Sequence, residues 1–411
     1  MPMTLQALLD ALHIDSYPAY WDALYPDAAL EYAGQGCLYT SEEFLRALDA
    51  ELDLFPLRRD VVYRAAAAIR KNDLLARYTV VLARAIRNVP REFYAEHASL
   101  RLPGPSEGED PLPYEMTGFF ALISTVPAEV RALRRRGVPE DIIRTTVQGF
   151  DFSITVFERR HDRPGFDTGR MNWCSNFMPP SNTLTIGRFN FAPGSFRYPV
   201  VVLQNAAGAY RILMRGVRIH RSGLLLGSPN ATDEDGAYDA DFIETDDYYE
   251  GYSPASVTPG KPVVVQKSRV RLLKTGWKVV LQEGDGFLVT HIPEAQPFGH
   301  DYQLASYRRA REVYARCFPD LDIRGIHCRS WLLAPQMQVF LAPDANLTLF
   351  QKDHLLYPCE CNGQGVFSHL FTRPVERLED LPERTSMERG VKAIYLHGGV
   401  LYEAAGFNVT K

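Results

Sequence analysis

The 411-residue sequence contains no run of eighteen apolar residues, so no membrane-spanning helix is expected. Its N-terminus lacks the basic start and the apolar core of a secretory leader. Only six cysteines occur, a density that fits reduced thiols in a cytoplasm better than a disulfide framework. The formal net charge of −5 gives no reason to expect nucleic acid as a partner. We therefore expect a cytoplasmic protein with neither a membrane nor nucleic acid as its main partner.

Several catalytic motifs are also missing. The sequence has no Gly-x-Ser-x-Gly, no Walker phosphate loop and no His-Glu-x-x-His. The residue types that bind zinc gather in one region, at His354, Cys359, Cys361 and His369. The single residue between the two cysteines is short for a structural zinc site, so we predict separate thiols in a loop and no bound metal.

The first part of the chain has a helical pattern. Leu75, Tyr78, Leu82 and Ile86 recur at helical spacing, and four consecutive alanines precede them at 65–68. Hydrophobic residues make up 46% of the chain and charged residues 23%, which is ordinary for a globular protein. The length favours two or three domains. We predict a helical N-terminal domain over residues 1–165.

After about Pro164 the pattern changes to short runs of strand-forming residues between turns. Their close spacing predicts mostly antiparallel strands. A long helix then follows from Asp301, its predicted N-cap, to Phe318. The predicted strands are residues 185–191, 198–203, 211–214, 217–220, 262–265, 276–281, 286–292, 323–328, 347–350 and 366–371. The fold class predicted from these elements is α+β, with a mixed, mostly antiparallel C-terminal domain over residues 166–411.

One segment of this series has the composition of a functional site. The strand that begins at Gly286 stops at His291-Ile-Pro-Glu294, and the helix at Asp301 follows. A helix N-terminus carries unpaired N–H groups and a partial positive charge, so a loop that leads into one can bind phosphate. Histidine is the usual general base near neutral pH. His291 and Glu294 are therefore the candidate catalytic residues.

Several fragments resemble a bacterial family of acyltransferase domain-containing proteins. This family combines a helical N-acyltransferase N-terminal domain with a GNAT-like C-terminal domain. The fragments that carry the resemblance are Arg136-Gly-Val-Pro-Glu140, Thr185-Ile-Gly-Arg-Phe-Asn-Phe191, Val289-Thr-His-Ile-Pro-Glu294, Cys328-Arg-Ser-Trp-Leu-Leu-Ala-Pro-Gln336, Asp344-Ala-Asn-Leu-Thr-Leu-Phe-Gln351, Leu381-Pro-Glu-Arg-Thr-Ser-Met-Glu-Arg389 and His397-Gly-Gly399. They span roughly residues 118 to 400 of this sequence in the family's order.

The resemblance implies an acyl-coenzyme A cofactor and acyl transfer to an amine or small polar acceptor. In the GNAT architecture two neighbouring strands part, pantetheine fills the gap, and the next helix N-terminus receives the pyrophosphate. Here the strands would part just past Thr290, with Ile292 beyond it, and the phosphates would meet Gly299 and Asp301. The loop departs from the family's glycine-rich pattern, since it has one glycine and two prolines. The phosphates would therefore also need Arg308 and Arg309.

The strand that follows the long helix ends in Cys328, Ser330 and Trp331, the candidate substrate-binding residues. A buried thiol is the expected state of Cys328, because neighbouring strand residues point to opposite faces and His327 cannot pair with it. An alternative is a non-catalytic ligand-binding protein that keeps the GNAT-like fold with a degraded coenzyme A site. A metabolite-binding module that uses the aromatic strand residues from Phe189 to Phe196 is a third possibility.

Overall fold

The computed structural model describes residues 3–88, 101–177, 182–294, 297–371 and 377–410. By its internal contacts the chain forms two compact units, Met1–Thr185 and Ile186–Lys411. The boundary between these units lies C-terminal to the 165/166 boundary proposed from sequence. None of the described helices combines the length and the apolarity needed to cross a bilayer.

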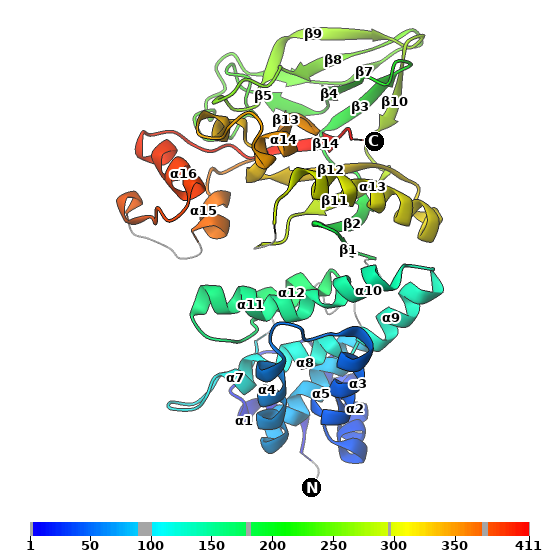
Figure 1. The fold of residues 1–411 in the computed structure, drawn as a ribbon, viewed down its shortest axis with the longest axis vertical. Helices are drawn as coiled ribbons and strands as arrows, with labels where there is room; N and C mark the ends of the chain where they lie inside the picture. The colour runs from blue at the N-terminus through cyan, green and yellow to red at the C-terminus, as the bar shows by residue number, and fades with distance from the viewer. Residues whose placement is uncertain (1–2, 89–100, 178–181, 295–296, 372–376, 411) are drawn as a thin grey trace. The chain divides into compact units, whose positions relative to one another are not determined.

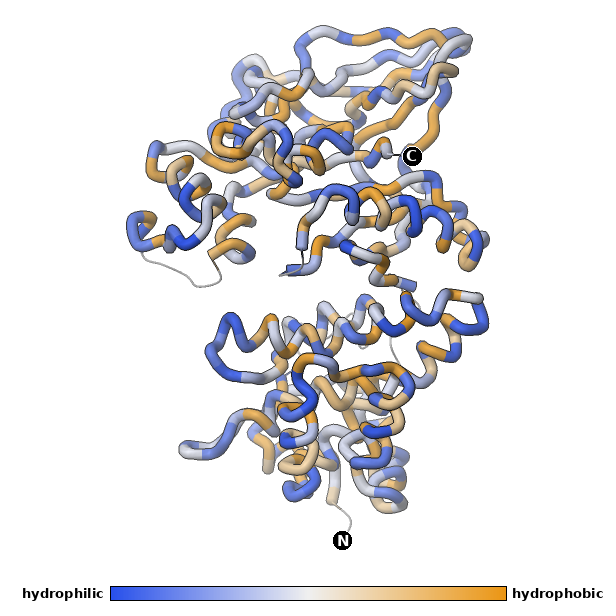
Figure 2. The backbone as a smooth tube through the Cα atoms, in the orientation of Figure 1, coloured by the Kyte–Doolittle hydropathy of each residue, from blue (hydrophilic) through white to orange (hydrophobic). Residues whose placement is uncertain are grey.

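The first unit is helical, as the sequence predicts (Figure 1). Its helices are α1 (Leu5–Ala11), α2 (Trp21–Gln35), α3 (Glu42–Leu52), α4 (Arg59–Lys71), α5 (Asp73–Asn88), α7 (Leu112–Glu115), α8 (Thr117–Ile123), α9 (Val126–Arg135), α10 (Glu140–Val147), α11 (Gly149–His161) and α12 (Thr168–Ser175). All seven residues of α8 are buried, and α5 buries ten of its sixteen. In Figure 2 hydrophobic and hydrophilic stretches alternate along the surrounding helices, as expected for helices with one buried face.

The carboxyl group of Asp151 connects α11 to the segment just before α4. Asp151 of α11 is fully buried and accepts backbone N–H groups from Leu57 at 2.7 Å and Arg58 at 3.1 Å. These donors lie just before α4, whose N-terminus has no side-chain cap. Burial raises the pKa of Asp151 to about 6, against the lowering effect of the two N–H groups. The carboxylate therefore joins two segments that are distant in sequence.

Glu129 of α9 should make the stability of the helical unit depend on pH. Its side chain is only 4% exposed, and burial raises its pKa to about 7. The unfolded chain ionises this group near its ordinary pKa of about 4.3, whereas the folded chain retains the proton up to about pH 7. The folded state therefore binds more protons between these values, and stability falls as pH rises, by a total on the order of 3 kcal/mol.

The substitution Glu129→Gln removes this titration. Thermal melts followed by circular dichroism should show the variant gaining stability over the wild type at pH 8, with little difference at pH 4. Glu107→Gln, at an exposed residue, is the control and should leave the melt unchanged at both pH values. A variant that loses stability at pH 8 but not at pH 4 would show instead that Glu129 is stabilising in its ionised form.

The second unit is built around a six-stranded sheet with the strand order β1-β2-β11-β12-β14-β13. Its strands are β1 (Leu184–Ile186), β2 (Phe189–Ser195), β11 (Gly286–His291), β12 (Ile323–Ser330), β13 (His354–Pro358) and β14 (Ala404–Asn408). β11 and β12 pair in parallel, whereas the β2–β11, β12–β14 and β13–β14 pairs are antiparallel. The mixed, mostly antiparallel character predicted from the sequence is confirmed.

Three smaller sheets contain the other described strands of this unit. They pair as β10-β3-β4, β5-β6 and β7-β8-β9. Their strands are β3 (Val200–Asn205), β4 (Tyr210–Met214), β5 (Val217–Ile219), β6 (Tyr238–Ala240), β7 (Ile243–Glu244), β8 (Tyr248–Pro254), β9 (Val265–Leu273) and β10 (Trp277–Leu281). The strand predicted at 262–265 is wrong in place, because β9 begins where that prediction ends.

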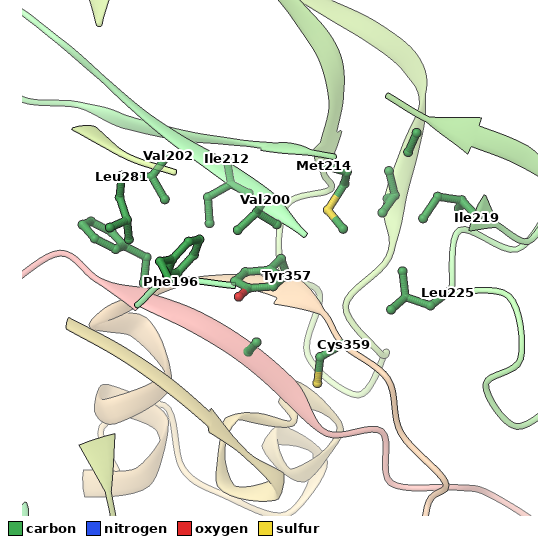
Figure 3. Close-up of a cluster of buried hydrophobic side chains, with 14 of the residues drawn as sticks. Phe196, Val200, Val202, Ile212, Met214, Ile219, Leu225, Leu281, Tyr357 and Cys359 are labelled. Atoms are coloured by element: carbon green, nitrogen blue, oxygen red, sulfur yellow. The ribbon is translucent and has the colours of Figure 1, made fainter. Parts of the chain in front are cut away.

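A hydrophobic core joins the six-stranded sheet to this second layer (Figure 3). Val200, Val202 and Ile212 come from β3 and β4, and Phe287, Tyr357 and Phe407 come from the large sheet. The other face of the large sheet packs on helix α13 (His300–Cys317), which follows β11 (Figure 1). Tyr307 of α13 is fully buried there, with its ring centroid 5.0 Å from that of Phe189 and 5.8 Å from that of Phe191. The end of β11 thus lies between two packed layers.

The remaining elements include two corrections. Residues 347–350 and 366–371, predicted as strands, lie in helices α14 (Asn346–Lys352) and α15 (Gly365–Leu370). A short apolar run fits either structure, and here the burial of one face against the domain decides for helix. The other elements are 3₁₀ helices η1 (Leu38–Thr40), η3 (Pro319–Leu321), η4 (Trp331–Leu333), η5 (Pro335–Val339) and η6 (Leu378–Asp380), and helix α16 (Ser386–Leu396).

Candidate functional site

The two central parallel strands separate near their C-terminal ends. The register joins Gly286 to Ile323, Leu288 to Ile326 and Val289 to His327. Beyond Val289, β11 stays paired only with β2, and beyond His327, β12 stays paired only with β14, among the described residues. We call this opening the fork. The last pair between the strands, Val289 with His327, comes one residue earlier than the parting just past Thr290 that the sequence analysis expects.

Side chains alternate between the two faces of the sheet at the fork. Phe287 and Val289 belong to the core shared with the second layer, so His291 lies on that same face. Thr290 lies on the opposite face, beside Tyr307 of α13, and is 2% exposed. The fork therefore has one face toward α13, and a second face where His291 is the last strand residue.

His291, which the sequence analysis selected as a candidate catalytic residue, is the last residue of β11. It is half-buried at the end of β11, opposite Asn190 of β2. Burial lowers the pKa of His291 below its ordinary value of 6.5, so the imidazole is neutral at neutral pH. A neutral imidazole has a lone pair that can accept a proton. Glu294 follows three residues later and is also half-buried.

The other arm of the fork holds the three residues predicted to bind substrate. Cys328 is fully buried, and burial raises the pKa of its thiol to about 12, so it keeps its proton. Ser330 accepts the backbone N–H of Leu332 at 3.1 Å and thereby caps η4. Trp331, the first residue of η4, is half-exposed. Of the three, Ser330 and Trp331 are partly exposed, whereas Cys328 is not.

Helix α13 begins two residues earlier than its predicted N-cap implies. Gly299 is the N-cap and His300 the first helical residue, whereas Asp301 lies exposed in the first turn. The prediction of Asp301 as N-cap is wrong because His300 is held in the helix by two contacts. Its backbone N–H donates to Asn346 Oδ1 at 3.1 Å, and its Nε2 lies 2.8 Å from Asp353 Oδ2.

Glycine cannot cap the first turn with a side chain, and Asn346 Oδ1 accepts only the N–H of His300. The N–H groups of Asp301 and Tyr302 have no partner within the helix. Arg308 and Arg309 are exposed, but they lie eight and nine residues further along, roughly 12 Å by the rise of an α-helix. The helix N-terminus and these two arginines are therefore separate positive regions along one helix.

Arg188, in the turn between β1 and β2, is a residue that the sequence analysis did not select. Its side chain is only 3% exposed, and Nη2 donates to the carbonyl oxygen of Pro293 at 2.9 Å. The guanidinium carbon lies 5.0 Å from the ring centroid of Phe298. Nε and Nη1 are buried without a hydrogen-bond partner. Burial lowers the pKa of the guanidinium to about 10, so it stays charged.

The backbone of this turn is fixed against α13. The N–H of Arg188 donates to Ser306 Oγ at 2.8 Å, and Ser306 donates to the carbonyl of Tyr302 at 2.7 Å. Gly187 has φ +59, and a Cβ atom there would lie 2.3 Å from Ser306 Oγ. The side-chain donors Nε and Nη1 of Arg188, in contrast, have no partner among the described residues. Leaving a buried N–H donor unpaired costs about 1–3 kcal/mol, and more when the group is charged. One sequence signal could have identified Arg188, namely an arginine directly after a glycine within a run of buried strand residues.

Two other histidines near the fork are structural. His327 Nε2 lies 2.7 Å from the hydroxyl of Tyr357, and His354 Nδ1 donates to the Phe350 carbonyl at 2.8 Å. Burial lowers their pKa values to about 3 and about 4, so both are neutral. The other ring nitrogen of His354, Nε2, lies 3.3 Å from the hydroxyl of Tyr307.

The thiols of the predicted loop lie apart from these histidines. Cys359 is buried, whereas Cys361 Sγ accepts the backbone N–H groups of Gly363 at 3.1 Å and Glu403 at 3.3 Å. His369 is exposed on α15. In the parts of the chain that the structure describes, no three such ligands are grouped for a metal.

A cavity of about 550 Å³ lies at the same edge of the large sheet as the fork. Arg329, on the arm of β12 beyond the fork, lines it together with Glu360 and Glu403. Arg329 Nε lies 3.7 Å from Glu403 Oε2. The remaining lining residues are Leu226, Gly227, Ser228, Cys361, Asn362 and Gly365. With two carboxylates and one guanidinium, the cavity favours a cationic guest.

Comparison with known protein families gives a match for each of the two units. A family model described as the GNAT-like C-terminal domain matches residues 184–408, and one described as the N-acyltransferase N-terminal domain matches residues 45–178. None of the curated proteins compared is significantly similar in sequence.

Solved structures show the same overall fold. One is an acyltransferase in complex with coenzyme A and 10C-teicoplanin, which is 17% identical, with a TM-score of 0.62 and full coverage of both chains. Another, in complex with decanoyl-CoA and teicoplanin, is 17% identical, with a TM-score of 0.60 and 99% coverage of each chain. An acyltransferase mutant in complex with octanoyl-CoA matches equally well, with the same identity, TM-score and coverage. At this identity the similarity shows a shared fold.

Proposed function

Because the chain belongs to the family that joins an N-acyltransferase N-terminal domain to a GNAT-like C-terminal domain, we propose that it transfers an acyl group from acyl-coenzyme A to an amine or another small polar acceptor. The observation that carries this proposal is the fork. Parallel pairing between β11 and β12 ends at Val289 and His327, although both strands continue. The opening leaves unpaired backbone edges that an extended pantetheine arm can pair with.

The residues around the fork fit coenzyme A. Thr290 and Ile292 line the edge of the β11 arm, and Gly299 and Asp301 present the uncapped N-terminus of α13 to a phosphate. Arg308 and Arg309 add positive charge further along the helix. When bound, the cofactor supplies an activated thioester carbonyl. The exposed carboxylate of Asp301 points against tight phosphate binding, and the orphaned donors of Arg188 support it.

His291 is the proposed general base. An amine acceptor arrives mostly as an ammonium ion and must lose a proton before it can attack a carbonyl carbon. The neutral, half-buried imidazole can take that proton at neutral pH. Glu294 is the second candidate for the same role, since it lies in the turn that follows the strand. Unpaired backbone N–H groups of the fork would polarise the acyl oxygen.

The acceptor is proposed to bind beside Ser330 and Trp331 and to extend into the cavity around Arg329. Support comes from position, because Arg329 and Ser330 are adjacent on the β12 arm. Charge gives further support, since Glu360 and Glu403 would attract an ammonium group. A neutral small molecule without an amine would gain less from this cavity.

Calorimetric titration tests the cofactor. The full chain should bind octanoyl- or decanoyl-CoA, the thioesters bound by its structural relatives, with a Kd in the micromolar range and a heat that free fatty acid does not reproduce. Incubation with a panel of primary amines should then release free thiol. Failure of coenzyme A, acetyl-CoA and the longer thioesters to bind at millimolar concentration would overturn the transferase proposal. It would support the alternative, a ligand-binding protein with a degraded cofactor site.

A further inference from the structure

Arg188 is a buried cation without an anionic partner among the described residues. Its one side-chain hydrogen bond goes to a neutral carbonyl, that of Pro293. Its Nε and Nη1 donors face no acceptor, and no carboxylate forms a salt bridge with it. Buried charges in proteins are normally paired, so an arginine kept in this state needs an explanation.

A purely structural role explains only part of this arrangement. The contact with Pro293 and the packing against Phe298 tie together the two described ends of the loop that joins β11 to α13. One N–H donor and an apolar stem suffice for that, and a glutamine could supply both. The two remaining donors point to a ligand that brings its own acceptors.

The position of Arg188 narrows the chemistry of that ligand. Its backbone N–H bonds Ser306 in the second turn of α13, and its guanidinium packs against Phe298, one residue before the N-cap Gly299. The uncapped helix N-terminus and the two free guanidinium donors are therefore parts of one region. Both favour an anion with several oxygens, and arginine binds phosphate oxygens in a forked geometry.

The loop sequence strengthens the case for phosphate. A phosphate-binding loop normally offers a series of backbone N–H groups, but Pro293 and Pro297 have none. Side-chain donors from a neighbouring turn can replace them. We propose that Arg188, together with the N-terminus of α13, binds the diphosphate of acyl-coenzyme A. This inference rests on the proposed function.

The test compares acyl-coenzyme A with thioesters that lack the 3′-phosphate, or lack the diphosphate together with the adenosine. The Kd values of the wild type, Arg188→Met and Arg188→Lys are measured for acyl-coenzyme A, its 3′-dephospho form and S-acyl-pantetheine. Arg188→Met should weaken both nucleotide thioesters about 10–100-fold, the range for lost hydrogen bonds to a charged group. It should leave S-acyl-pantetheine within about twofold, and Arg188→Lys should fall between. Arg316→Met, at an exposed arginine in the last turn of α13, is the matched control.

Several outcomes would overturn the inference. An equal loss for S-acyl-pantetheine would make Arg188 a support for the loop. A loss for the full cofactor that disappears with the dephospho form would assign Arg188 to the 3′-phosphate instead. No change for any ligand would also contradict it.

Two further measurements test the inference if the variant does not fold or if no thioester binds the wild type. Should Arg188→Met fail to fold, inorganic pyrophosphate is used with the wild type, where it should compete with acyl-coenzyme A but leave S-acyl-pantetheine bound. Should no thioester bind the wild type at all, the proposed function fails. Arg188 is then judged by pyrophosphate alone, which should protect the wild type against thermal unfolding more than it protects Arg188→Lys.

Discussion

Replacing His291 with alanine is expected to lower kcat of acyl transfer by about 10²–10⁴-fold, the usual contribution of a general base. The acceptor would still bind, because the cavity carboxylates and the fork are unchanged, so KM should move far less than kcat. His369→Ala, at an exposed histidine of α15, is the matched control and should keep full activity. Steady-state kinetics with one amine and one acyl-coenzyme A provide the measurement.

The pH profile distinguishes His291 from a merely structural residue. Burial lowers the pKa of this imidazole below 6.5, and only the neutral form can accept a proton. The acidic limb of kcat/KM in the wild type should therefore have its midpoint below pH 6.5, with activity rising through it as pH increases. That limb should disappear in the residual activity of His291→Ala. A variant that keeps the limb, together with a large loss in Glu294→Gln, would make Glu294 the base.

Replacing Tyr307 with alanine should remove about 3–5 kcal/mol from the free energy of unfolding of the C-terminal unit. Tyr307 is fully buried between α13 and the large sheet, against Phe189, Phe191 and the ring of His354. The truncation would leave a cavity there. It would also remove the hydroxyl that donates to His354 Nε2, whose Nδ1 is already committed to Phe350.

Tyr307→Phe separates these two losses. It keeps the ring and removes only the hydroxyl, so its cost should be about 1–3 kcal/mol. Tyr302→Ala, at a residue 46% exposed on the same helix, should change stability by no more than about 0.5 kcal/mol. Urea unfolding followed by fluorescence and circular dichroism gives all three values. Equal effects at positions 302 and 307 would show that α13 contributes little packing energy to the sheet.

Local sequence patterns were enough to predict most of the helices and strands. Helices α5 and α13 were predicted because their apolar residues recur with the period of a helix, and α4 because it contains four consecutive alanines. The strand from Gly286 was predicted because strand formers run up to a proline. Short apolar runs were less informative. Residues 347–350 form a helix although they fit a strand, since four residues cannot distinguish the two periods.

Strand β14 shows where local pattern fails altogether. Its sequence, Ala-Ala-Gly-Phe-Asn, has weak strand propensity, yet all five residues are buried. It exists because β12 and β13 pair with it on both sides. The hydrogen bonds of those neighbours override propensity, and the neighbours lie far away in the sequence.

The sequence by itself determined the order of strand, loop and helix and the residue types at their junction, His291, Glu294 and Gly299 among them. Only the tertiary structure decided that β11 and β12 part after Val289 and His327, and that Arg188 is buried beside α13 with two donors unused. The physical reason is that a turn or a helix start depends on neighbouring residues. The parting of the strands depends on Val289 and His327, which are 38 residues apart, and the contacts of Arg188 depend on segments more than a hundred residues away. These segments meet only in the folded chain.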